Sequence, residues 1–147
     1  MSSIRSATVI PAVARRAIFS VAVSSLPSTI VPAWPKLMPL FEADPDTRAI
    51  VIYTEPGGRM EAELAGWVTD NDSRLPIVAF MAGKFMDDEE MQGMSFGHAG
   101  TIVEGKEDSA TEKIARLEAA GIPVVQRIDE IPDLVKAKLA ERAGSAA

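Results

Sequence analysis

The chain has 147 residues, a net charge of −6, no cysteine and one histidine. These counts exclude disulfides, thiolate nucleophiles, Cys-based zinc sites and a multi-histidine metal site within one chain. A hydrophobic content of 47% is ordinary for a globular protein, and no apolar run approaches the roughly 20 residues that span a membrane. We therefore predict a single domain over residues 1–147 that binds no metal and no membrane.

The charge is unevenly distributed. Residues 1–41 carry four cations and no acid, whereas residues 42–147 carry all 21 acids and 11 cations, a balance of −10. The larger part lacks the basic stripe that would collect phosphate charge, so we expect no nucleic-acid binding.

The first 41 residues diverge from the rest and are the hardest to assign. A helix over residues 7–17 would be broken by Pro11, residues 18–23 predict a strand, and prolines crowd the region before Phe41, where a helix is expected. The acid-free composition is also that of an organellar transit peptide, but the strand favours a first strand–helix unit of the same domain. A segment foreign to the domain, from a truncated or frame-altered gene, is a further alternative.

From residue 42 onward, strands and helices alternate. Residues 48–54 and 75–82 are short apolar runs typical of buried strands. A long loop over residues 83–97 then precedes a third short strand at residues 101–103. The helix between the first two strands is predicted by an apolar stripe of Met60, Leu64, Trp67 and Val68.

Two helices and a strand follow. Ser109 and Glu112 predict a capping box for a helix that stops at Gly121, and residues 122–125 predict a fourth strand. Asp129 is expected to cap the last helix, which frays over residues 143–147. This alternation predicts parallel strands joined by right-handed crossovers, with helices on both faces of one sheet.

Six motifs occur in the order seen in one known family. They are FEADPDTRAIV (41–51), EPGG (55–58), PIVAFMAG (76–83), GHAG (97–100), ATEKIA (110–115) and LEAAGIPV (117–124). Over residues 42–142 the chain resembles the C-terminal CoA-ligase domain of succinyl-CoA synthetase α subunits, which NDP-forming acyl-CoA synthetases and ATP-citrate lyase share. The resemblance implies an α/β, three-layer, flavodoxin-like fold with a mainly parallel sheet of about five strands.

The resemblance also implies a chemistry. In this family a histidine relays a phosphoryl group between an acyl-phosphate and a nucleotide, and the acyl group is released as a CoA thioester. His98 matches the phosphorylated histidine, and Glu55 matches the glutamate that bonds its ring. A neutral imidazole is a competent nucleophile near pH 7, and a carboxylate on one ring nitrogen fixes the tautomer that attacks. The candidate phosphate-approaching glycines are Gly57, Gly58, Gly97 and Gly100.

Partners and cofactors are implied in the same way. We expect a component of an acid–CoA ligase that is inactive alone and works with an ATP-grasp β-type subunit and a separate CoA-binding Rossmann chain. This chain alone would bind no cofactor, while CoA and ATP or GTP with Mg belong to the full complex. The expected location is cytoplasmic, with an organellar matrix as the minor alternative. Homo-oligomerisation is a further expectation. The alternative function is a non-catalytic binding or oligomerisation module that keeps the fold.

The chain also departs from the family. The CoA-binding Rossmann domain is absent, and the family's Ser- and Gly-containing phosphate turn is replaced by sequences without glycine at residues 5–8 and 24–29. Lys84 and the acids at residues 87–90 lie in a loop longer than the family's, for which we predict a solvated loop or partner contact.

Two other groups of residues have simpler explanations than a site. Asp44 and Asp46 fall in a proline-containing turn, so turn chemistry explains them better than a receiver-type phosphoacceptor. Core or loop packing explains Met86, Met91 and Met94 better than a soft contact surface.

Overall fold

A computed structural model describes residues 17–21, 34–91 and 109–145 of the chain. These residues form a parallel sheet with the strand order β1-β2-β3-β4. The strands are β1 (Ala17–Val21), β2 (Ala49–Thr54), β3 (Ile77–Met81) and β4 (Val124–Val125). The parallel sheet is confirmed, but the described part holds four strands rather than about five. The strand predicted at residues 101–103 lies outside it.

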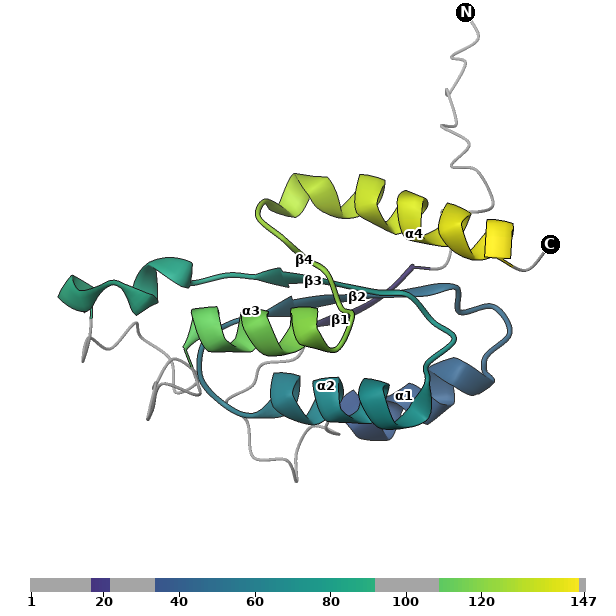
Figure 1. The fold of residues 1–147 in the computed structure, drawn as a ribbon, viewed down its shortest axis with the longest axis horizontal. Coiled ribbons are helices and arrows are strands. Elements are labelled where there is room, and N and C mark those ends of the chain that lie inside the picture. The colour runs from purple at the N-terminus through teal and green to yellow at the C-terminus, as the bar shows by residue number, and fades with distance from the viewer. Residues whose placement is uncertain (1–16, 22–33, 92–108, 146–147) are drawn as a thin grey trace, which may run out of the picture.

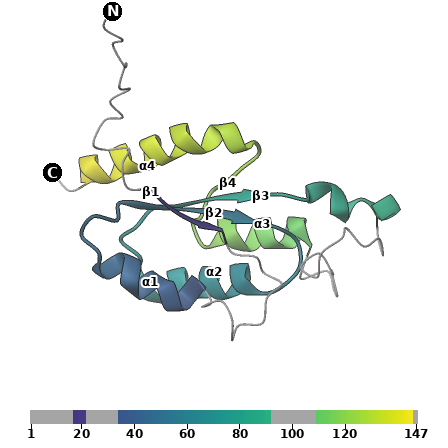
Figure 2. The ribbon, with the colours of Figure 1, turned by 180° about the vertical axis from the view of Figure 1, so that it is seen from behind.

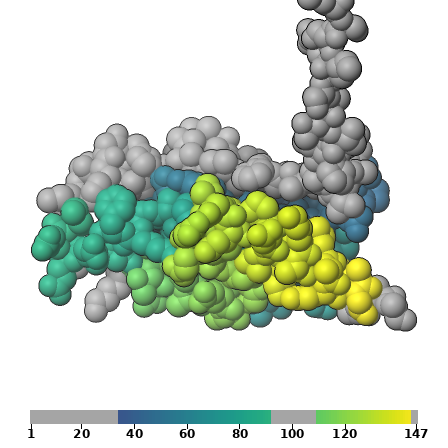
Figure 3. Space-filling model, turned by 90° about the horizontal axis from the view of Figure 1, so that it is seen from above, coloured from purple at the N-terminus to yellow at the C-terminus, as the bar shows by residue number. Residues whose placement is uncertain are grey.

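Helices cover both faces of the sheet (Figures 1 and 2). On one face lie α1 (Trp34–Ala43), α2 (Met60–Asn71) and α3 (Ala110–Ala119). Each joins a strand to its next neighbour in the same direction across the sheet, and right-handed crossovers then place all three on one side. The last helix, α4 (Ile131–Ser145), lies over the opposite face, as Figure 3 shows from above.

The alternation of side chains along the strands supplies one apolar core to each face. Ile50 and Ile52 of β2 pack beneath the three-helix layer, whereas Val51 between them packs with Ile131 of α4. Strands with apolar residues at successive positions are expected where a sheet is covered on both sides. None of the described helices is long and apolar enough to cross a membrane.

The helix before Phe41 forms in spite of its prolines. Trp34 and Met38 lie one turn apart in α1 and are both buried, whereas Pro39 faces outward. Pro39 removes one helical N–H donor, a loss of local stability that the burial of the two large apolar side chains offsets.

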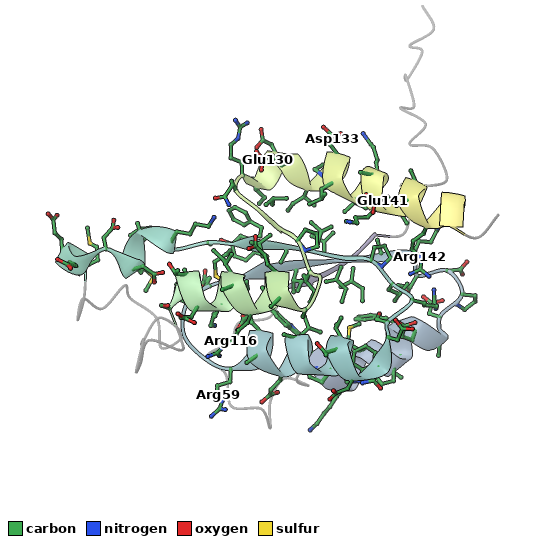
Figure 4. The ribbon with its side chains drawn as sticks, viewed as in Figure 1. Arg59, Arg116, Glu130, Asp133, Glu141 and Arg142 are labelled. Atoms are coloured by element: carbon green, nitrogen blue, oxygen red, sulfur yellow. The ribbon has the colours of Figure 1, made fainter. Side chains whose placement is uncertain are left out.

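The cap predicted for the last helix is wrong. A short 3₁₀ segment, η6 (Ile128–Glu130), precedes α4, so Asp129 lies inside this segment, two residues before α4 begins, and pairs with Arg127 instead. The carboxylate of Glu130, labelled in Figure 4, accepts hydrogen bonds from the backbone amides of Gln126 and Arg127 at 3.1 Å each. By contrast, the Ser109 hydroxyl accepts the amide of Glu112 at 3.2 Å and caps α3, as predicted.

Candidate functional site

The turn formed by residues 55–58, here called the Glu55 turn, connects the carboxyl end of β2 to α2. Pro56 and Gly57 are buried, and Glu55 and Gly58 are partly buried. Gly57 has φ of 88° and Gly58 has φ of 71°, in the left-handed region that strains residues with a Cβ atom. The sequence prediction of a turn at this position is therefore confirmed. Its glycines are needed by the backbone whether or not a phosphate approaches it.

A buried ion pair lies beside the Glu55 turn. Glu61 in the first turn of α2 and Lys113 in α3 are exposed by only 0% and 2%, and Lys113 Nζ lies 2.7 Å from Glu61 Oε2. The hydroxyl of Thr54, the last residue of β2, donates to the other oxygen of the same carboxylate. An ion pair thus connects α2 to α3, and a hydrogen bond connects the same carboxylate to β2, in a part of the molecule that is otherwise apolar.

The same ammonium group also holds the backbone of the turn. Lys113 Nζ donates to the carbonyl oxygen of Glu55 at 3.0 Å and to that of Gly57. The ammonium group therefore forms an ion pair with the Glu61 carboxylate and donates hydrogen bonds to two carbonyl groups of the Glu55 turn. A charged donor is roughly twice as strong as a neutral one, so this lysine is a firm anchor for the turn.

The residues after β3 pack against the turn from another side. Gly83 has φ of 71°, and a Cβ atom there would lie 2.9 Å from Pro56 Cδ. The amide of Ala82 donates to the carbonyl of Thr54 at 2.8 Å and continues the pairing of β2 with β3. The close approach of Gly83 leaves Pro56 little space in which to shift.

The acidic loop after β3 has one structural role that the sequence did not reveal. Asp87 ends the short 3₁₀ segment η2 (Lys84–Asp87), and η3 (Glu89–Met91) follows it. The Asp87 carboxylate accepts the amides of Ala110 and Thr111 at 3.0 and 2.7 Å, and the Thr111 hydroxyl at 2.6 Å. The prediction of a solvated or partner-binding loop is therefore corrected at this residue. Because the Asp87 carboxylate already accepts these two amides, the amino terminus of α3 does not fit a phosphate site.

The structure agrees with the predictions made for three other acids of this loop, for Met86 and for the turn at Asp44. Asp88, Glu89 and Glu90 are exposed, and Met86 is buried, as core packing requires. The Asp44 carboxylate accepts the amide of Asp46 at 3.1 Å and the hydroxyl of Thr47 at 2.6 Å, which confirms turn chemistry there.

The predicted site residues divide into two sets. Glu55, Gly57 and Gly58 lie together in the Glu55 turn at the carboxyl edge of the sheet, where open α/β sheets bind ligands. His98, Gly97, Gly100 and Met94 lie outside the described residues. Within the described ranges, no group of three or more His, Asp or Glu side chains is arranged to hold a metal ion.

Glu61 and Lys113 were missed by sequence reasoning, although a signal was present. Glu61 lies beside Met60 and one turn before Leu64 and Ala65, so it belongs to the buried stripe of α2. Lys113 occupies the corresponding stripe of α3, between Ala110 and Leu117. Opposite charges on the buried stripes of two neighbouring helices predict a buried ion pair.

The opposite edge of the sheet carries a hollow of about 300 Å³. Its residues come from the loops before β2 and β3 and from the second half of α4, where Figure 4 labels Arg142. They include three arginines, Arg48, Arg74 and Arg142, none of which sequence reasoning singled out. Because Glu55 follows the carboxyl end of β2, this hollow is separate from the Glu55 turn.

Comparison with known proteins connects this geometry to a group of ligases. No family model matches the chain. It is 41% identical over 104 residues to subunit SauD of an ADP-forming sulfoacetate–CoA ligase from Bilophila wadsworthia, covering 71% of this chain and 34% of the relative. It is 38% identical over 102 residues to the α subunit of the ADP-forming succinate–CoA ligase from Methanothermobacter thermautotrophicus, covering 69% and 33%. The chain thus spans about a third of the length of the curated relatives it matches.

Two solved structures share the fold. An ATP citrate lyase from Methanothrix soehngenii in complex with citrate and coenzyme A matches with a TM-score of 0.62 at 22% identity, over 71% of this chain and 17% of that one. An ATP citrate lyase from Methanosaeta concilii in complex with (3S)-citryl-CoA matches with a TM-score of 0.60 at 23% identity, over 68% and 16%. At these identities the likeness concerns the fold alone. The resemblance to CoA-ligase α subunits, read from six motifs, is confirmed by the sequence relatives.

Proposed function

Because this chain is homologous to α subunits of CoA ligases over 69–71% of its length, we propose that it is the phosphohistidine-bearing component of such a ligase. His98 is the phosphate acceptor in this proposal, and Glu55 is the carboxylate that orients its ring. A cytoplasmic location belongs to the same proposal.

The reaction step is a phosphoryl transfer to nitrogen. One imidazole nitrogen of His98 attacks the phosphorus of an acyl-phosphate, the N–P bond forms, and the P–O bond to the acyl oxygen breaks. The carboxylate leaves with the electron pair of that bond. Attack of a nucleoside diphosphate oxygen on the same phosphorus then regenerates the imidazole. Glu55 accepts the proton of the other ring nitrogen by hydrogen bond, which keeps the attacking nitrogen unprotonated.

The observation that carries the proposal is the held Glu55 turn. It presents a carboxylate at the carboxyl edge of a parallel sheet, on a backbone fixed by Lys113 and by the close approach of Gly83. A carboxylate that must orient a ring needs a rigid support, and this turn has one. Gly57 and Gly58 also carry no Cβ atom, which lets a phosphate approach their backbone closely.

The proposal assigns the other binding tasks to partners. CoA would be bound by a separate Rossmann chain, and the nucleotide with its Mg ion by an ATP-grasp β-type subunit. This division agrees with the amino terminus of α3, whose amides at Ala110 and Thr111 are occupied by Asp87.

Radiolabel transfer tests this function. The full chain is incubated with γ-labelled ATP and, one by one, with the β subunits of succinate, malate and sulfoacetate CoA ligases. We expect acid-labile, base-stable phosphate on the chain, and its complete loss in His98→Ala. Since the chain has one histidine, no second histidine can carry the label.

Glu55→Gln tests the second residue, with Asp88→Asn as the matched control because Asp88 is an exposed acid of a neighbouring loop. Labelling should fall in Glu55→Gln and stay at the wild-type level in Asp88→Asn. Equal labelling of both variants would remove Glu55 from the site. No label with any β subunit would reject the relay and leave the non-catalytic binding module as the function.

A further inference from the structure

The strongest unexplained feature of the structure is the charge buried beside the Glu55 turn. A lysine and a glutamate exposed by 2% and 0% are rare in a core, because removing either ion from water costs several kcal/mol. Apolar side chains of similar size would fill the same space between α2 and α3 at no such cost. What they would not supply is a donor to the carbonyl groups of Glu55 and Gly57, which Lys113 Nζ provides.

From this geometry we infer that Lys113 is a positioning residue, which fixes the Glu55 turn and thereby the direction of the Glu55 carboxylate. The inference deepens the proposed function and rests on it for the role of Glu55. Glu61 serves as the counter-ion that holds the Lys113 ammonium in place. Thr54 in turn fixes Glu61 by donating to its second oxygen.

The contacts form a closed loop. Thr54 ends β2 and bonds Glu61, Glu61 pairs with Lys113, and Lys113 bonds the carbonyl of Glu55, the residue next to Thr54. A shift of the Glu55 backbone therefore breaks at least one charged hydrogen bond. With both ends of the turn held, the direction in which the Glu55 side chain leaves the backbone is fixed relative to β2 and α2.

The test must separate positioning from folding. Lys113→Met alone leaves the Glu61 carboxylate buried without its counter-ion and is expected to weaken the fold. The double variant Lys113→Met/Glu61→Gln removes both charges, keeps the volumes, and leaves an amide to accept the Thr54 hydroxyl. It should fold but lose the two bonds to the turn.

The first measurement needs no partner and no activity. Amide hydrogen exchange of Gly57, Gly58 and Arg59 is followed by NMR in the wild type and in the double variant, with Val78 of β3 as the internal reference. We expect exchange of the turn amides to rise about tenfold or more in the double variant and that of Val78 to stay unchanged. Unchanged exchange at the turn would overturn the inference.

The second measurement couples Lys113 to Glu55. The rate of phosphorylation of the chain by potassium phosphoramidate, a phosphoryl donor that needs no partner protein, is measured with and without Glu55→Gln. In the wild-type background Glu55→Gln should slow labelling, roughly tenfold to a hundredfold for a lost orientation. In the Lys113→Met/Glu61→Gln background it should have almost no further effect. Independent, multiplicative effects would overturn the positioning role.

A rescue experiment uses the absence of cysteine from the chain. Lys113→Cys is unfolded, alkylated with 2-bromoethylamine, and refolded, which restores an ammonium group at nearly the original length. Alkylation with iodoacetamide gives the neutral control. The ammonium form should recover the protection of the turn and the effect of Glu55→Gln, and the neutral form should recover neither. Equal recovery with both reagents would reject the role of the charge.

The two proposals fail in different ways. If the wild type is never labelled at His98, the proposed function fails, while the exchange of the turn amides still decides whether Lys113 holds the turn. If labelling occurs and the turn amides are insensitive to Lys113, the relay stands and the positioning role is rejected.

Discussion

The two edges of the sheet each carry a cation that holds backbone carbonyl groups in place, but one cation is buried and the other is exposed. At the carboxyl edge Lys113 binds the Glu55 turn and pairs with Glu61, and these side chains are exposed by 2% and 0%. At the amino edge Arg74 pairs with Glu42 at 3.1 Å, with exposures of 41% and 22%. The guanidinium group of Arg74 donates to the carbonyl oxygens of Phe41, Glu42, Asp44 and Thr47.

From this comparison we expect burial, rather than the number of hydrogen bonds, to decide how much the fold depends on such a cation. In contact with water, each charge of a broken pair is rehydrated, and an exposed pair contributes about 0–1 kcal/mol. In the interior, the charge left behind has no such replacement, and removing one partner costs about 3–5 kcal/mol. For this protein we propose that the buried pair serves the arrangement of the Glu55 turn more than the overall stability.

The largest effect is expected from breaking the buried pair. Lys113→Met should lower the free energy of unfolding by about 3–5 kcal/mol, because it strands the Glu61 carboxylate between α2 and α3. Lys113→Met/Glu61→Gln should recover most of that loss, since neither charge remains. Urea unfolding followed by circular dichroism measures both variants. A double variant no more stable than the single one would show that the stranded Glu61 carboxylate is not the cause of the loss.

A smaller effect is expected at the amino edge. Arg74→Met removes more hydrogen bonds than Lys113→Met, yet the partly exposed guanidinium should contribute only about 1 kcal/mol once solvent screening is counted. Lys136→Met, which removes a cation exposed by 76%, serves as the control and should be close to neutral. A loss at Arg74 as large as that at Lys113 would refute burial as the deciding factor.

Local chemistry made much of the fold predictable. β2, α2 and β3 follow from short apolar runs and a helical stripe, and the Ser109 cap follows from hydrogen-bonding chemistry within four residues. The helix through Pro39 and the misplaced cap at Asp129 were harder, because burial of Trp34 and a 3₁₀ turn before α4 decide them.

The candidate site divides in the same way. The Glu55 turn was predictable because its glycines follow directly after a strand, and two positive φ angles require them. Its anchoring was signalled only by the position of Glu61 and Lys113 on two buried stripes. The two residues come from helices that precede and follow β3 in the chain, and a charge in a helical segment is ordinarily placed on the solvated face. Only the packing of α2 against α3 brings the two charges together, and single-sequence periodicity does not specify which helices pack.

The smallest effect is expected at an ion pair that shares the carboxyl edge with Lys113 but not its burial. Arg127 and Asp129 follow β4 with exposures of 70% and 60%, and the guanidinium Nε donates to Asp129 Oδ1 at 2.9 Å. This hydrogen bond lowers the pKa of Asp129 and raises that of Arg127. A carboxylate with a lowered folded pKa stabilises the protein above its unfolded pKa, and the contribution is lost as the pH falls through the folded value.

NMR titration of the Asp129 carboxyl should therefore give a pKa below the ordinary value for aspartate, and Arg127→Gln should raise it toward that value. At neutral pH the urea midpoint of Arg127→Gln should stay close to that of the wild type, since the exposed Asp129 carboxylate is hydrated when its partner is removed. Lys113 and Arg127 share the carboxyl edge and differ in burial, so the two variants together separate the effect of location in the fold from the effect of burial. If Arg127→Gln destabilised the fold as strongly as Lys113→Met, the carboxyl edge itself, and not the burial of its charge, would be what the fold depends on.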